Sequence, residues 1–126
     1  MDVKIFNKAM DIMKDKLGDA FIASSIFMNI DGQSIVTHDP HEAVDVGAAN
    51  ALFNQVTAYI NKSLKGAGFP AQLNRYYLMD LTGNKIVIVV QLDEDLQWGM
   101  MIDISQTTLG LVLNVALPEA MALFEK

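Results

Sequence analysis

Two groups of strand-like segments, each joined internally by short turns, constrain the fold of this chain more than any other feature. Residues 21–37 are predicted to form a hairpin, with a strand up to Ile30 and a two-residue turn at Asp31-Gly32. That turn is expected because glycine accepts positive φ at no steric cost. Residues 73–105 read as three strands separated by turns at 82–84 and 93–95. Parallel neighbours need a connection of about a dozen residues, so both groups must pair antiparallel.

Helical periodicity precedes and follows these strand groups. An amphipathic helix is predicted over residues 2–17, and a closing helix over 107–125 with Ser105 or Thr107 as its cap. Proline removes a backbone hydrogen bond from a helix interior. Pro118 is therefore expected either to kink the closing helix or to split it and open its second half.

The longest helix is predicted between the two strand groups. Asp39-Pro40-His41-Glu42 reads as a capping signature, with aspartate as N-cap, proline as first helical residue and glutamate as the reciprocal carboxylate. The helix should then run to about Leu64 and stop at Gly66 and Gly68. The stripe expected to lie on the sheet consists of Ala49, Leu52, Phe53, Val56, Ile60 and Leu64.

The order of elements predicts the fold class. Lys85–Leu92 (KIVIVVQL) is β-branched on both faces, so helices must cover both sides of the sheet. The predicted fold is α+β with the order α-β-β-α-β-β-β-α. A five-stranded antiparallel sheet lies between one long helix on one face and the N- and C-terminal helices on the other. A single domain over residues 1–126 is expected.

A second side of the long helix is built from small, uncharged residues. It carries Gly47, Ala48, Ala51, Gln55 and Ala58. An exposed helix face usually carries lysine and glutamate. Small side chains let two helix backbones approach closely, so this side indicates a self-association surface. The alternative is a solvated face filled by alanine, which is the best helix former.

The strand that follows the long helix should lie at an edge of the sheet. It begins near Leu73, contains Arg75, Tyr76 and Tyr77, and lacks proline. An edge with so little protection favours pairing with another chain. Two copies paired there about a two-fold axis would join their sheets. The alternative is an edge covered by one of the chain's own helices.

The hairpin, the long helix, the three-strand meander ending at Ser105 and a closing helix beginning TTLGLVLNVAL together resemble the roadblock/dynein light chain family. The resemblance spans essentially the whole chain, although Pro118 interrupts a closing helix that the family keeps continuous. It implies a prokaryotic member that forms a homodimer through the long helix and the next strand. It also implies a non-enzymatic regulatory or scaffold role toward a small Ras-like GTPase.

Composition argues against several other classes of function. The chain has no cysteine, which excludes disulfides and thiolate chemistry. Its net charge is −6 and its basic residues are scattered, so neither nucleic acid nor an anionic membrane is an expected partner. No signal-peptide core is present at the start, and a cytoplasmic location is expected.

No catalytic, metal or cofactor site is predicted. His38 and His41 lie near Asp39 and Glu42, but no second cluster completes a ligand set and both acidic residues have capping roles. Neither a nucleophilic-serine pattern nor a glycine-rich phosphate loop is present. The alternative function is a small-molecule sensor domain or minor enzyme with a pocket between the sheet and a helix.

Overall fold

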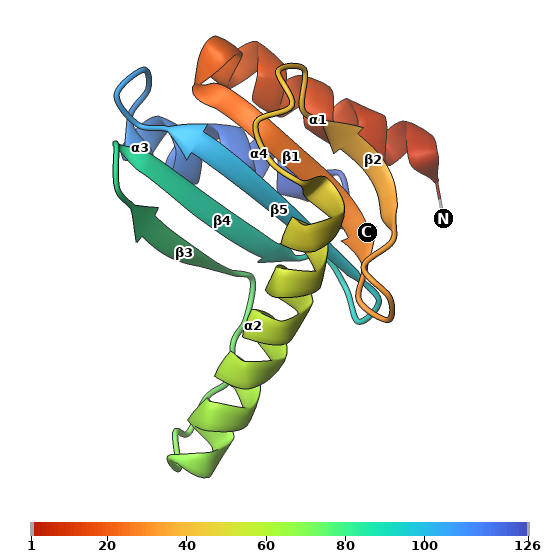
Figure 1. Cartoon of the computed structure of the whole chain (residues 1–126), viewed down its shortest axis with the longest axis vertical. Coiled ribbons are helices and arrows are strands. Elements are labelled where there is room, and N and C mark those ends of the chain that lie inside the picture. Colours follow the sequence, from red (N-terminus) through yellow and green to blue (C-terminus); the bar gives the residue numbers. More distant parts are fainter. Residues whose placement is uncertain (1, 126) are drawn as a thin grey trace.

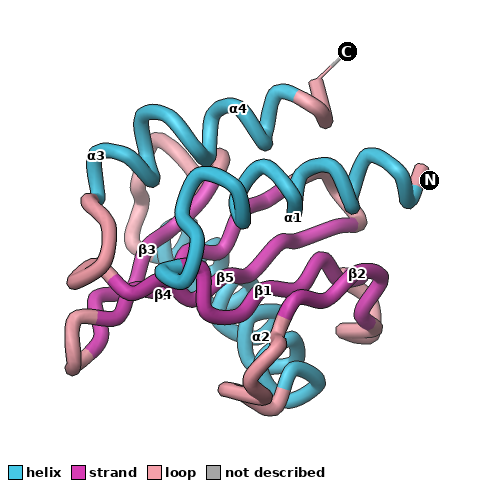
Figure 2. Tube along the Cα trace, turned by 90° about the horizontal axis from the view of Figure 1, so that it is seen from above, coloured by secondary structure: helices cyan, strands magenta, loops and turns pink. Residues whose placement is uncertain are grey.

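The computed structural model describes residues 2–125, which form a five-stranded antiparallel sheet with helices on both faces (Figures 1 and 2). The strands are β1 (Phe21–Met28), β2 (Ser34–His38), β3 (Tyr76–Leu81), β4 (Lys85–Gln91) and β5 (Leu96–Asp103). Their order in the sheet is β2-β1-β5-β4-β3. The predicted fold class is confirmed, and β3 lies at one edge of the sheet.

The helices form two outer layers. Figure 2 shows α1 (Val3–Leu17) and α4 (Leu117–Ala122) side by side on one face of the sheet, and α2 (Val46–Gly66) on the opposite face. The main core lies between the sheet and the α1/α4 layer. Its largest fully buried side chains include Met13, Ile88, Trp98, Met100 and Leu117. Within residues 2–125 no helix is both long and apolar enough to cross a membrane.

The predicted start of the long helix was wrong. The N-cap of α2 is Asp45, whose carboxylate accepts from the Ala48 amide at 3.1 Å. Asp39 instead caps a turn, because its carboxylate accepts from the amides of Ala43 at 2.8 Å and Val44 at 3.3 Å. Through this turn the chain passes from the end of β2 across β1 to the middle of the sheet face that α2 covers (Figure 1).

Several other boundaries differ from the predictions by a few residues. The hairpin loop covers residues 29–33 rather than two residues, with Gly32 at a φ of 74°. β3 begins at Tyr76 rather than Leu73. The cap of the closing helix is Thr108, which accepts from the Leu111 amide at 3.1 Å, and not Ser105 or Thr107.

The closing helical segment widens into a π-turn before Pro118. Helix α3 (Leu109–Leu111) passes into a π-helical turn (Val112–Ala116) and then into α4, in whose first turn Pro118 lies. The Leu117 amide donates to the Val112 carbonyl five residues back. This wider turn accommodates a residue that has no amide hydrogen. The structure therefore shows one continuous helical segment that contains a π-turn before Pro118, and not two separate helices.

Candidate interaction surface on α2 and the β3 edge

A buried layer of polar side chains holds the first half of α2 on the sheet. Gln97 of β5, which is 2% exposed, is at its centre. Its amide nitrogen donates to the side-chain oxygens of Asn29 and Asn54, both at 2.7 Å. Its oxygen accepts from the Thr57 hydroxyl at 2.7 Å and from the Gln91 amide at 3.2 Å. All four hydrogen-bonding positions of the amide are used, so this layer fixes the position of α2.

Tyr77 connects this layer to the edge strand β3. Its hydroxyl lies 3.0 Å from that of Thr57 on α2. Burial raises the pKa of the Tyr77 hydroxyl above its usual value, and the hydrogen bond with Thr57 opposes that rise. The phenol is therefore neutral at physiological pH and acts as a structural link between β3 and α2.

A close approach between Phe53 and Gly99 sets the spacing between α2 and the sheet. A Cβ atom at Gly99 would lie 2.6 Å from the nearest carbon of the Phe53 ring, which is closer than van der Waals contact allows. The same ring lies 6.2 Å from that of Phe27 on β1, centroid to centroid. Gly99 is therefore required for the aromatic ring to lie against β5.

The apolar stripe predicted to lie on the sheet is only partly buried there. Leu52 is 51% exposed, and the other five residues of the stripe are half-buried. The buried positions of α2 are instead Asn50 and Thr57. Figure 1 shows the reason: α2 crosses the sheet obliquely, and its second half extends past the β3 edge.

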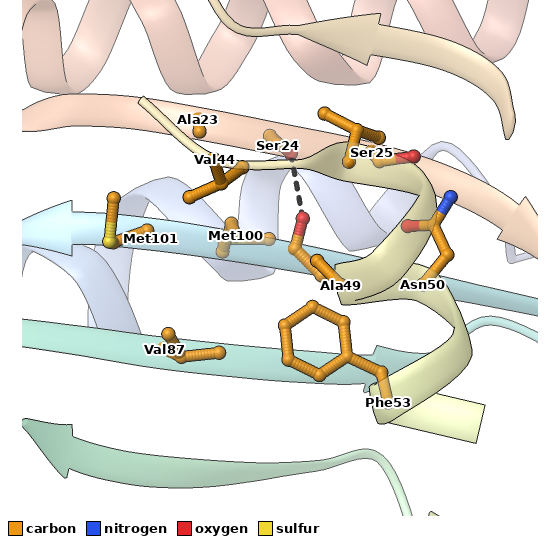
Figure 3. Close-up of a pocket in the computed structure, with 12 residues that line it drawn as sticks. Ala23, Ser24, Ser25, Val44, Ala49, Asn50, Phe53, Val87, Met100 and Met101 are labelled. Atoms are coloured by element: carbon orange, nitrogen blue, oxygen red, sulfur yellow. Dashed lines mark hydrogen bonds between the residues drawn. The ribbon is translucent and has the colours of Figure 1, made fainter. Parts of the chain in front are cut away.

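The two flanks of α2 face different parts of the molecule. Ala49 and Phe53 lie over β5 and β4 (Figure 3), and Val56 and Ile60 continue the same row at helical spacing. These four residues, together with the adjacent exposed Leu52 and Tyr59, form the apolar flank of α2. Tyr59 is 72% exposed.

The other flank of α2 faces the loop between β1 and β2. A Cβ atom at Gly32 would lie 3.6 Å from the Ala51 amide nitrogen, and Asn54 donates to the Met28 carbonyl at 3.3 Å. Gly47 and Ala58 share this flank at helical spacing. Ala48 and Gln55 lie between the two flanks. The five residues that were predicted to form a self-association surface on α2 are all exposed.

The predicted residues of the strand edge lie at the start of β3. Arg75 is exposed and immediately precedes the strand, whereas Tyr76 and Tyr77 are half-buried on opposite faces of it. β3 pairs with β4 on one side and, within residues 2–125, with no strand on the other. Tyr77 therefore lies under α2, whereas Arg75 and Tyr76 lie on the α4 face of the sheet and line a hollow there with Leu117 and Pro118. Gly47, Ala51 and Ala58 lie on the flank of α2 that faces the loop between β1 and β2.

The geometry gives little support to metal or acid–base chemistry. Across residues 2–125, no three His, Cys, Asp or Glu side chains gather in a group able to hold a metal ion. The ring of His38 stacks on Phe21 with centroids 5.1 Å apart, and burial lowers the pKa of its imidazole. Hydrogen bonds from Ser105 and Gln106 hold the pKa of Asp103 at about 2, which is consistent with a structural role in the turn after β5.

Comparisons with known proteins establish the fold. No protein-family model matches the sequence, and no curated protein matches it. The structure is nevertheless similar to MglB of Myxococcus xanthus, with a TM-score of 0.73 and 15% identity over 94% of this chain and 92% of that chain. It is also similar to an MglB with a tetrameric arrangement, with a TM-score of 0.70 and 14% identity over 95% of this chain and 88% of the other.

A Roadblock/LC7 domain from Streptomyces avermitilis is a further structural neighbour. Its TM-score is 0.65 at 12% identity, over 88% of this chain and 89% of that domain. The chain therefore has the α+β fold of the roadblock proteins. Among the neighbours of this fold, it is similar to bacterial MglB proteins.

Proposed function

We propose that this protein is a non-enzymatic homodimeric regulatory or scaffold module of the cytoplasm, which binds a small Ras-like GTPase. The observation that carries the proposal is the half-exposed apolar flank of α2, a helix whose second half extends past β3 (Figure 1), beside a β3 edge that pairs with no other strand among residues 2–125. A helix that is anchored on one side by a buried polar layer and carries exposed apolar side chains such as Leu52 and Tyr59 on another side is suited to a partner that covers it.

A second copy fits this surface better than an unrelated chain. Pairing of β3 with its own copy about a two-fold axis joins two sheets and satisfies the outward-facing backbone groups of both edges. The same axis lays the two α2 helices antiparallel. Asp45 at the start of α2 is then near Lys62 and Lys65 at the end of the partner's helix, which is a favourable charge arrangement.

The proposed dimer interface consists of Arg75, Tyr76 and Tyr77 together with the apolar flank, and it includes Ala48 and Gln55 beside that flank. Gly47, Ala51 and Ala58, which were predicted as part of the seam, take a peripheral position. Similarity to an MglB with a tetrameric arrangement supports self-association. The roadblock fold and the family resemblance support a GTPase as the further partner.

Mass measurement by light scattering tests the dimer. The chain has a mass of 13.9 kDa, and we expect twice this value at micromolar concentration. Leu52→Glu places a charge on the apolar flank and should give a monomer. Ala58→Glu, a matched charge on the other flank, should leave the dimer intact. A monomeric wild type contradicts the proposal, and dissociation by Ala58→Glu alone moves the interface to the other flank.

A further inference from the structure

The edge strand β3 presents the backbone groups of three residues to a second copy. Alternate residues of an antiparallel strand direct these groups to the same side. The Arg75 carbonyl accepts from the Gln91 amide of β4, so the backbone groups of Tyr76, Leu78 and Asp80 point outward. These three positions are symmetric about Leu78. A two-fold axis beside Leu78 therefore lets all three exchange hydrogen bonds with the same three residues of the partner.

Neighbouring registers use this edge less completely. An axis beside Tyr77 or Met79 leaves one outward residue of each strand opposite a residue outside β3. An axis beside Met79 also places the Asp80 carboxylate opposite the half-buried leucine at position 78 of the partner. With the axis beside Leu78, Tyr76 instead faces the partner's Asp80, and Leu78 faces its own copy.

Two charged groups at the ends of β3 are complementary in this register. Arg75 and Asp80 are both exposed, and no ion pair joins either of them to another residue among 2–125. Arg75 lines an open hollow of about 460 Å³ together with Tyr76 and α4. Asp80 is on the same face of the sheet, because it pairs with Ile86, which belongs to the core under α1 and α4.

We propose that the Asp80 carboxylate of each copy binds Arg75 at the edge of the partner's hollow, and that these two ion pairs set the register of the β3 edges. The inference rests on the proposed homodimer and adds the residues that align its two copies. Directly opposite residues have Cβ atoms about 4.5–5.5 Å apart, so the partner's Asp80 lies beside Tyr76 and within reach of the adjacent guanidinium. Glu125 lines the same hollow without an ion pair to Arg75, whose five donors can serve the partner's carboxylate.

Exchange of the two charges tests the ion pairs in the full chain. Arg75→Asp and Asp80→Arg each place like charges together twice in the dimer, whereas the double variant restores opposite charges. By analytical ultracentrifugation, we expect each single variant to raise the dimer Kd at least about fivefold, and the double variant to lie within about threefold of the wild type. Lys8→Glu changes the net charge as Arg75→Asp does, but on α1, and should have little effect. A double variant no tighter than either single variant overturns the proposal.

Single cysteines test the register, because the chain has none of its own. With the axis beside Leu78, the two Cα atoms at that position lie about 5.5 Å apart, within the range of a disulfide. Those of Met79 are offset by two residues and lie beyond about 7 Å. We expect Leu78→Cys to cross-link under mild oxidation on a non-reducing gel, and Met79→Cys to remain uncross-linked.

The outcomes separate this inference from the proposed homodimer. Cross-linking of Met79→Cys alone, or of neither variant although the wild type is a dimer, overturns the register and leaves self-association in place. A wild type that is monomeric by mass overturns the homodimer, and this inference with it.

Discussion

Replacement of Gly99 by alanine tests how α2 is held on the sheet. The added Cβ would lie 2.6 and 2.7 Å from two carbons of the Phe53 ring, about 1 Å closer than an ordinary carbon–carbon contact. Either the ring leaves its place over β5 or the first half of α2 moves away from the sheet. Inserting an atom into a packed site of this kind costs about 1–3 kcal/mol. For a chain of this length the melting temperature should fall by several degrees.

Urea denaturation of four proteins measures this effect without reliance on an absolute value. The set is the wild type, Gly99→Ala, Phe53→Leu and the double variant. Leucine is smaller than the phenyl ring, so the double variant should be more stable than the sum of the single effects by about 1 kcal/mol or more. Additive effects, or a Gly99→Ala variant within about 0.5 kcal/mol of the wild type, would refute the proposed contact.

Three further predictions follow from buried groups. Gln97→Leu removes the centre of the polar layer under α2 and should cost about 2–4 kcal/mol in urea denaturation, because its partners lose their hydrogen bonds. Trp98→Phe removes the indole donor to the Ser24 hydroxyl at 2.6 Å and should cost about 1–3 kcal/mol in the same assay; no loss would show that this bond contributes little. The pKa of Asp103 is about 2 in the folded chain, below its ordinary value of 3.8, so its contribution to stability is present above pH 4 and is lost as the pH falls toward 2. Ser105→Ala, which removes the hydroxyl donor at 2.6 Å, should weaken that pH dependence, and an unchanged urea midpoint profile between pH 2 and 5 would contradict it.

The fold could be predicted from the sequence because its signals are local and consistent. The β-branched run of β4 and the short turns within each strand group specify antiparallel pairing, and helical spacing specifies the three helical regions. The start of α2 could not be predicted in the same way. Asp39-Pro40 suits a helix cap and a turn equally well. The structure has the turn, because the chain must pass from the end of β2 to the middle of the sheet face that α2 covers before the helix can begin.

The candidate surface was only partly predictable for a physical reason. Helical periodicity identifies an apolar stripe but not how far the helix extends beyond the sheet, so Leu52 was assigned to the core although it is exposed. The polar layer around Gln97 was missed altogether. Its members are far apart in the sequence. The one signal that could have indicated it is the polar pair Asn54 and Thr57, which lies with Asn50 on one side of α2 at four- and three-residue spacing.

Hydrogen exchange along β3 tests most directly whether a second copy covers this edge. The Arg75 carbonyl accepts from the Gln91 amide at 2.7 Å. Because backbone groups alternate in direction along an antiparallel strand, the amides of Tyr76, Leu78 and Asp80 point away from β4. We predict that these three amides exchange slowly at high micromolar concentration and quickly in Leu52→Glu, while those of Tyr77 and Met79 stay protected in both. Rapid exchange of the outward amides in the wild type at every concentration would show that the β3 edge is free, and would contradict the proposed homodimer.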